Sequence, residues 1–256
     1  MQSDKTLAEV RKIFEGDRFA TENGAVIEEI GERSAVCSLT ITDSHRNAMG
    51  AVMGGVYFML ADFAFAVAAN WEKMMALIKG ANRPINVLNL FAYTGGATVA
   101  CLSAGAKVTH VDASKGMVGA AKENAELSGL GDAPIRYIVD DCKKFIEREI
   151  RRGNKYDGII MDPPSYGRGP GGEMWKIESD LYKFVELCSE VLSDNPLFVL
   201  INSYTTGLQP MVLQNVLKLT LKDFKGRVEA YEVGIATEEG ITLPCGAGGI
   251  FINDGK

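Results

Sequence analysis

The 256-residue chain is long enough for one large domain or two small ones. Its apolar content of 46% and charged content of 23% are ordinary for a globular protein. A formal net charge of −6 argues against a broad basic surface for nucleic acid, but it does not exclude a local basic cleft. With only two histidines we expect no metal site, and five scattered cysteines without a Cys-x-x-Cys pair indicate a reduced, cytoplasmic protein.

The first seventy residues mix helix-like and strand-like segments. Lys5–Phe14 is predicted to form an amphipathic helix, and Ala25–Ile30 and Ala35–Ile41 two short strands joined by a turn. A loop follows at His45–Gly50, and a helix at Gly54–Ala64. The charged N-terminus lacks an early apolar core, so we expect no signal peptide.

The stretch from Gly50 to Ala69 is almost wholly apolar and about long enough to span a bilayer. Asp62 lies inside it, and a charged residue near the bilayer centre costs roughly 2.5–3.5 kcal/mol. Gly54 and Gly55 also weaken the start of the helix. We therefore interpret this stretch as a buried helix and expect no membrane association.

Beyond residue 70, short apolar strands alternate with helices. The predicted strands are residues 85–91, 107–111, 135–139, 156–161 and 197–202, and the predicted helices are residues 96–103, 115–128, 142–152, 177–192 and 210–221. This alternation implies a parallel sheet that is covered on both faces. Two last strands, 227–233 and 248–252, are joined by a loop containing Gly and Pro and predict a closing strand pair.

The segment from Val87 to Asp112 carries the strongest functional signal. An apolar strand ends at a glycine pair, Gly95-Gly96, and the following strand ends at Asp112. The glycines permit a sharp turn and close approach of a ligand, and the amides that open the next helix favour an anion. Asp112 is suited to bind two ribose hydroxyls, or to cap the helix that begins near Ser114, and both roles are compatible.

A second motif, Asp162-Pro163-Pro164-Ser165-Tyr166, follows the strand that ends at Met161. Its two prolines fix a rigid turn, which can hold the aspartate and backbone carbonyls against a planar amine or base, while the aromatic ring stacks on it. The alternative is that the two prolines only end the strand and form a loop, without a functional role.

The residues on either side of that motif extend the candidate acceptor site. The glycine-rich segment Gly167–Gly172 is expected to form a mobile lid, in which Arg168 contacts a phosphate or is merely solvated. Asn202–Tyr204, which follows the fifth strand, is expected to line the acceptor side.

Residues 71–256 resemble a class I S-adenosylmethionine-dependent methyltransferase, because these motifs come in the right order and at the right spacing. The resemblance implies a Rossmann-like, seven-stranded α/β domain with S-adenosylmethionine as cofactor. It further implies that the adenine lies against Asp141 or Asp140 and the next backbone amide, although a helix cap is an alternative role for this acidic pair. The implied cofactor-binding residues are Phe91, Tyr93, Thr94, Gly95, Gly96, Asp112, Ala113, Ser114, Asp140, Asp141 and Cys142.

The Asp-Pro-Pro-Ser-Tyr form resembles ribosomal RNA methyltransferases that act on a guanine nitrogen or a cytosine carbon. The resemblance implies ribosomal RNA as a partner and a catalytic set of Asp162, Pro163, Pro164 and Tyr166. Cytosine C5 chemistry normally needs a cysteine nucleophile, and none lies beside the motif. Cys245 is the only late candidate, and a buried structural cysteine is its simpler interpretation. The sequence therefore favours methylation of nitrogen.

Residues 1–70 resemble the front half of a hotdog-fold acyl-CoA thioesterase of the phenylacetic-acid type. The pattern His-x-Asn-x-x-Gly at 45–50 precedes Gly-Gly-x-x-x-x-Leu-Ala-Asp at 54–62. The resemblance implies a partial α+β hotdog segment, with an oxyanion hole at Gly54 and Gly55, Asp62 as base or nucleophile, Asn47 orienting the attack, and a homodimer through this segment. The strands that should complete that sheet are missing, so acyl-CoA hydrolysis and a hybrid that binds cofactor without turnover are alternative functions.

Overall fold

The computed structural model describes residues 7–15, 18–31, 34–53, 55–56, 59–60, 71–168, 174–236 and 241–254. The chain divides into two compact units. One consists of Met1–Glu72 with Val233–Cys245, and the other of Lys73–Glu232 with Gly246–Lys256.

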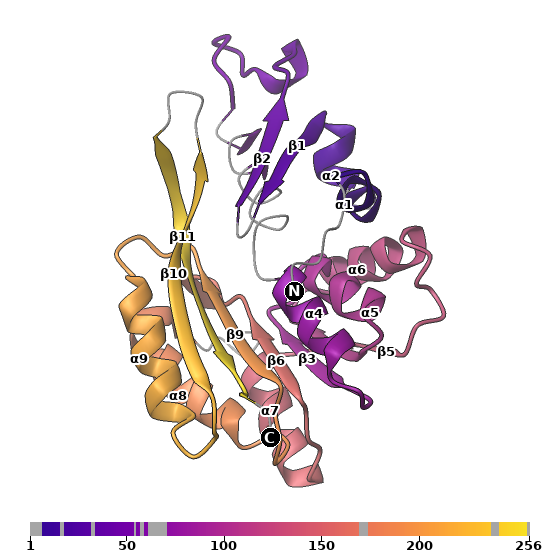
Figure 1. Ribbon diagram of the computed structural model, residues 1–256. Coiled ribbons are helices and arrows are strands. Elements are labelled where there is room, and N and C mark those ends of the chain that lie inside the picture. The colour runs from indigo at the N-terminus through magenta and orange to yellow at the C-terminus, as the bar shows by residue number, and fades with distance from the viewer. Residues whose placement is uncertain are drawn as a thin grey trace. The chain divides into compact units, whose positions relative to one another are not determined.

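A seven-stranded mixed sheet has the strand order β10-β11-β9-β6-β3-β4-β5 (Figure 1). Its strands are β3 (Asn86–Leu90), β4 (Lys107–Asp112), β5 (Ile135–Val139), β6 (Gly158–Met161), β9 (Phe198–Ser203), β10 (Arg227–Ala236) and β11 (Thr242–Ile252). The five strands from β5 to β9 are parallel, and β11 is antiparallel to β9. The chain moves outward from β3 first to β4 and β5 and later to β6 and β9. A ligand site is therefore expected at the carboxyl ends of the strands beside β3.

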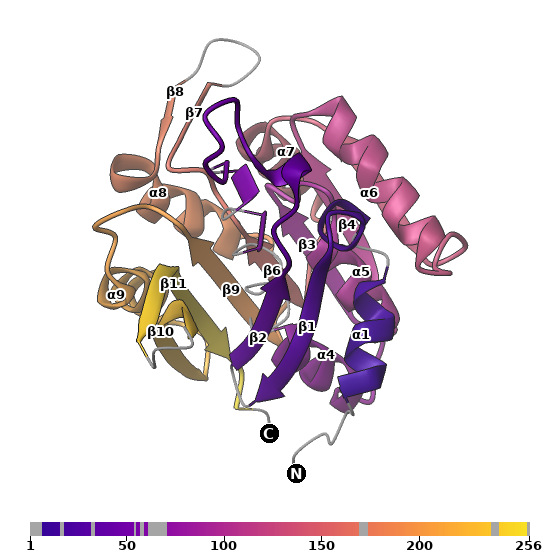
Figure 2. The same cartoon turned by 90° about the horizontal axis from the view of Figure 1, so that it is seen from above.

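Helices cover both faces of this sheet, as the two views show (Figures 1 and 2). They are α4 (Trp71–Gly80), α5 (Gly96–Ser103), α6 (Lys115–Leu127), α7 (Cys142–Arg152), α8 (Ile177–Ser189) and α9 (Pro210–Thr220). One face is covered by α7, α8 and α9, whose apolar side chains join those of β3, β6 and β9 in one buried cluster. α5 and α6 pack against β3, β4 and β5. The burial of both faces explains why the central strands are continuous apolar runs.

Most predicted elements of this unit are present with bounds within about three residues of those predicted, and α5, α7 and β5 match to the residue. The prediction of a loop at Gly167-Arg168 was wrong, because these residues belong to strand β7 (Tyr166–Arg168), which pairs with β8 (Met174–Lys176). The rest of the predicted lid lies outside the described residues. The loop before the last strand is also shorter than predicted, because β11 already begins at Thr242.

The smaller unit contains a β-hairpin with two helices against it. Helices α1 (Leu7–Phe14) and α2 (Arg18–Glu22) contact β1 (Ala25–Gly31), which pairs antiparallel with β2 (Ser34–Leu39). The predicted helix and both predicted strands are thus present. The predicted helix at 54–64 lies largely outside the described residues. Within the part of the chain that the structure describes, no helix is long and apolar enough to cross a membrane.

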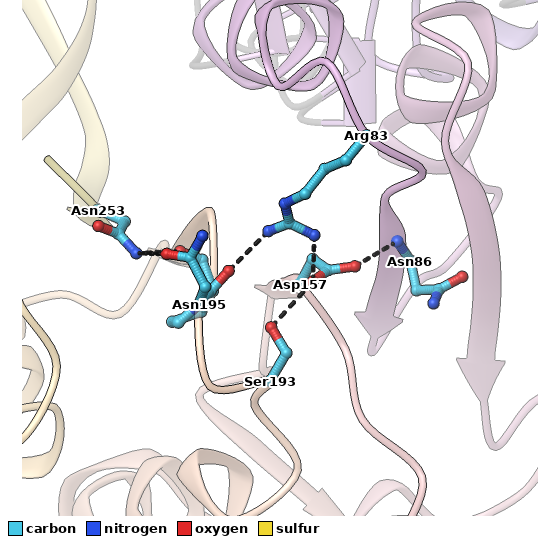
Figure 3. A network of polar contacts seen from close by, with 7 residues as sticks. Arg83, Asn86, Asp157, Ser193, Asn195 and Asn253 are labelled. Carbon is cyan, nitrogen blue, oxygen red and sulfur yellow. Dashed lines mark hydrogen bonds and ion pairs between the residues drawn. The ribbon is translucent and has the colours of Figure 1, made fainter. Parts of the chain in front are cut away.

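A polar network ties the parallel strands together at their amino ends (Figure 3). The Asp157 carboxylate, just before β6, accepts hydrogen bonds from Arg83 Nη1 at 2.6 Å, Asn86 N–H at 2.9 Å and Ser193 Oγ at 2.9 Å. The other guanidinium nitrogen of Arg83 donates to the carbonyl of Asn195 at 2.6 Å. The carboxylate is only 9% exposed, so these donors compensate for its burial. This edge is occupied by structural contacts, which leaves the carboxyl edge for a ligand.

Candidate active site

The turn after β3 has an unusual backbone. Phe91, Tyr93 and Gly95 have positive φ angles of 54°, 46° and 85°. A left-handed conformation is costly for residues other than glycine and is retained where surrounding contacts impose it. Here the Ala92 N–H donates to the carbonyl of Val111 at 3.1 Å, and the Gly95 N–H to Ala92 O at 3.0 Å. This cofactor turn, residues 91–95, leads directly into α5, whose first amides face the carboxyl edge of the sheet.

Gly95 is required by packing as well as by conformation. A Cβ at this position would lie 2.9 Å from the Cβ of Ala121 on α6 and 3.5 Å from Cε1 of His110. The glycine therefore lets α6 approach the turn. This packing requirement stands beside the expectation that the missing side chain lets a ligand approach the turn.

Asp112 binds the cofactor turn from the end of the neighbouring strand. Its Oδ2 accepts the Tyr93 N–H at 3.0 Å, and its Oδ1 accepts the Ser114 N–H at 2.8 Å. The cap of α6 is Ser114, whose Oγ accepts from the Met117 N–H at 3.4 Å, so the capping role considered for Asp112 falls to its neighbour. Each carboxylate oxygen keeps a lone pair for a further donor, as a ribose hydroxyl would require.

The acidic pair after β5 is engaged in local contacts. Asp141 caps α7, because its Oδ1 accepts the Lys144 N–H at 2.9 Å. The helix cap that the sequence offered as an alternative role for this residue is therefore present. Asp140 forms an ion pair with Arg148 and also accepts the Asp141 N–H at 2.9 Å. The Cys142 thiol lies buried below the cofactor turn and accepts the Phe91 N–H at 3.3 Å. Cys142 thus supports the turn with its side chain and has only its backbone to offer a cofactor.

A buried polar chain under the cofactor turn was not predicted from the sequence. Asn89 Nδ2 lies 2.9 Å from Thr98 Oγ1, which in turn lies 3.0 Å from His110 Nδ1. His110 is fully buried, and this burial lowers its pKa to about 4, although the nearby Asp112 opposes the shift. The neutral imidazole thus links β3, β4 and the first turn of α5, where the cofactor turn ends.

The Asp-Pro-Pro-Ser-Tyr motif, residues 162–166, meets the cofactor turn at the same edge of the sheet. The Asp162 N–H donates to the carbonyl of Leu90 at 3.4 Å, beside the start of that turn. Farther along this acceptor loop, Ser165 Oγ lies 2.7 Å from Thr205 Oγ1, and the Ile177 N–H donates to Ser165 O at 3.1 Å. The predicted cofactor and acceptor motifs therefore lie on adjacent strands, β3 and β6.

Three tyrosines follow three neighbouring parallel strands at this edge. Tyr93 follows β3, Tyr166 follows β6, and Tyr204 follows β9, with exposed fractions of 58%, 56% and 42%. Asn202, at the end of β9, is buried, and its Oδ1 has no hydrogen-bond partner within the described residues. The three exposed rings are suited to stack on a planar ligand.

The residues of the thioesterase resemblance are described only in part. Asn47 accepts the N–H groups of Met49 at 2.9 Å and Ala51 at 3.1 Å, so its side chain shapes its own loop. Gly54 and Asp62 lie outside the described residues.

The strand order and the site together define a Rossmann-like methyltransferase fold. The amides of the cofactor turn and α5 would suit a carboxylate, the Asp112 carboxylate would suit ribose hydroxyls, and both lie beside the switch point of the sheet. These groups fit S-adenosylmethionine, whose sulfonium supplies an electrophilic methyl group. The family described as S-adenosylmethionine-dependent methyltransferase matches residues 71–218, and the chain belongs to this family.

Solved structures and curated relatives agree with this assignment. The crystal structure of an S-adenosylmethionine-dependent methyltransferase from Agrobacterium tumefaciens superposes with a TM-score of 0.70 at 31% sequence identity. The superposition covers 92% of this chain and 79% of that chain. The ribosomal RNA large subunit methyltransferase K/L from Shewanella frigidimarina is 38% identical over 43% of this chain. The ribosomal RNA large subunit methyltransferase I from Klebsiella pneumoniae is 41% identical over 31% of this chain. The matched parts make up only 15% and 20% of those two relatives.

Proposed function

We propose that this protein transfers the methyl group of S-adenosylmethionine to a base nitrogen of ribosomal RNA. The observation that carries the proposal is the junction of the two motifs, where Asp162 N–H bonds to the carbonyl of Leu90 at 3.4 Å. This contact puts the acceptor loop next to the cofactor turn. The curated relatives that share this region are named as large-subunit ribosomal RNA methyltransferases, which supports RNA as the acceptor.

In this proposal the site residues divide into two groups. Asp112 binds the ribose, the cofactor turn with Gly96 receives the methionine carboxylate, and the backbone after Asp141 meets the adenine. Asp162, Pro163, Pro164 and Tyr166 present the acceptor, because the rigid turn holds polar oxygens beside an exposed ring. Such a site works mainly by positioning, since the methyl group is already electrophilic.

None of the four cysteines with described side chains is suited to be the nucleophile that cytosine C5 methylation needs, and the side chain of Cys245 lies outside the described ones. Cys37, Cys101, Cys142 and Cys188 are free and buried, and burial raises the pKa of the Cys37 and Cys101 thiols to about 12. The pKa values of the Cys142 and Cys188 thiols are raised in the same direction for the same reason. Buried neutral thiols are poor nucleophiles. Free thiols are also consistent with the cytoplasmic location that we propose.

We assign residues 1–70 to a first domain and residues 71–256 to the methyltransferase domain. The likeness to the Agrobacterium tumefaciens methyltransferase covers 92% of the chain, more than residues 71–256 alone provide, so it extends into the first domain. Acyl-CoA hydrolysis through a hotdog-like homodimer is the alternative. Turnover of an acyl-CoA that is abolished by Asp62→Ala would favour it.

The test is transfer of tritiated methyl from S-adenosylmethionine to large-subunit ribosomal RNA transcribed without modifications. We expect label in the RNA, and a nucleoside digest should place it in an N-methylated base. Asp162→Ala should lose the transfer while retaining cofactor binding by calorimetry. Label at the same rate with both proteins, or no label from a protein that binds the cofactor, would contradict the proposal.

A further inference from the structure

Trp175 contacts both halves of the site. It belongs to β8, and its indole Nε1–H donates to the carbonyl of Pro164 in the acceptor loop at 2.6 Å. Its ring centroid lies 5.5 Å from that of Phe91, the first residue of the cofactor turn. A half-buried indole with its N–H satisfied is a well-fixed group, because ring packing and hydrogen bond restrict the same two side-chain torsions.

The partners of Trp175 are themselves constrained. Phe184 of α8 lies 5.4 Å from the Phe91 ring and 5.5 Å from the Trp175 ring, so the three aromatic rings form a closed cluster. Phe91 has a left-handed backbone with φ of 54°, and its N–H is held by the Cys142 thiol. A shift of the cofactor turn therefore moves a ring that touches the indole directly.

Each part of the acceptor loop beyond its first residue has its own tether, and Tyr166 at its end pairs with Lys176 of β8. Ser165 is held by Ile177 N–H and by the Thr205 hydroxyl, whereas the hydrogen bond to the Pro164 carbonyl comes from Trp175. The Pro-Pro segment has no amide hydrogens of its own, so it can be fixed only through its carbonyls and its ring contacts.

We propose that Trp175 is a positioning residue. It fixes the acceptor loop through its indole N–H and couples that loop to the cofactor turn through its ring contact with Phe91. This inference rests on the proposed role of residues 162–166 in holding the acceptor. Any coupling between two sites is reciprocal, so cofactor binding should order the loop and loop contacts should affect the cofactor turn.

The variant Trp175→Phe separates the two contacts, because it retains an aromatic ring and removes the N–H donor. Trp71→Phe is the matched control, since it applies the same change to the other tryptophan of the chain. In Trp175→Phe we expect the amides of residues 165–168 and Ile177 to exchange hydrogen roughly fivefold faster, with the β3 amides unchanged. Methyl transfer to the RNA transcript should show a kcat about tenfold lower with a KM for S-adenosylmethionine within about twofold of wild type.

A second measurement keeps Trp175 in place. In Trp71→Phe the only tryptophan is Trp175, and titration with S-adenosylhomocysteine should change its fluorescence with the same midpoint as calorimetric binding. Unchanged fluorescence despite binding would overturn the coupling. Unchanged exchange in Trp175→Phe, or a loss of cofactor affinity as large as the loss of kcat, would overturn the positioning role. Exchange and fluorescence need no acceptor, so failure of the RNA assay alone would count against the proposed function instead.

Discussion

Replacing Asp112 by Asn tests the cofactor site most directly. The substitution keeps the shape of the side chain, but its amide nitrogen cannot accept a hydrogen bond. One of the two backbone N–H groups, Tyr93 at 3.0 Å or Ser114 at 2.8 Å, then loses its acceptor. A hydrogen bond to a charged group contributes about 1.5–3 kcal/mol, and the ribose hydroxyls lose their charged partner as well. We expect cofactor binding to weaken by about 3 kcal/mol, or roughly 100-fold in Kd.

Calorimetric titration with S-adenosylhomocysteine measures this loss. Asp132→Asn is the control, because this substitution makes the same change in net charge. Asp132 is an exposed aspartate in the turn between α6 and β5. Circular dichroism should show that both variants are folded. If folded Asp112→Asn binds within about twofold of wild type, the assignment of this carboxylate to the ribose is refuted.

Three further predictions follow from the described contacts. Gly95→Ala should lower the free energy of unfolding by about 1–3 kcal/mol in urea titrations, because φ is 85° and the new Cβ would lie 2.9 Å from that of Ala121. His110 should make stability fall with acidification: its pKa is about 4 when folded and near 6.5 when unfolded, so the unfolded chain takes up the proton first between these pH values. The free energy of unfolding should fall by about 3 kcal/mol by pH 4. The variant His110→Gln, which has no imidazole, should lack this part of the pH dependence. Arg83→Met should cost about 2–4 kcal/mol in thermal unfolding, because Asp157 stays buried with its ion pair broken, and an unchanged melting temperature would contradict that reasoning.

The alternating part of the fold could be predicted because each element carries its own local signal. The helix α7 begins at an Asp cap and ends before Gly153, which has a left-handed φ of 69°, so both ends are encoded in neighbouring residues. The strand β5 is a short run of mostly apolar residues between turns. By contrast, α4 was not predicted, although Met74, Met75 and Ile78 have helical spacing and are buried. The apolar run that precedes it obscures that period.

The hairpin of β7 and β8 was missed for a different physical reason. Each strand has three residues, too few to show a period of two, and the intervening Gly-Pro-rich segment suggests a loop. What holds the hairpin to the site is the contact of Trp175 with Pro164 and Phe91, and no local pattern encodes a contact across such distances in sequence. The lone Trp in this segment was the available signal.

The two halves of the site differ in how they are built, and this difference decides what the sequence reveals. The cofactor half consists of a backbone turn and the carboxylate at the end of the next strand, so a glycine pair and an aspartate at a fixed distance identify it. The acceptor half depends on side chains brought together by the fold, such as Ser165 with Thr205, 40 residues apart. Loops of this kind can change without disturbing the sheet. A local sequence pattern therefore identifies the methyl donor, whereas the choice of acceptor depends on contacts that only the fold brings together.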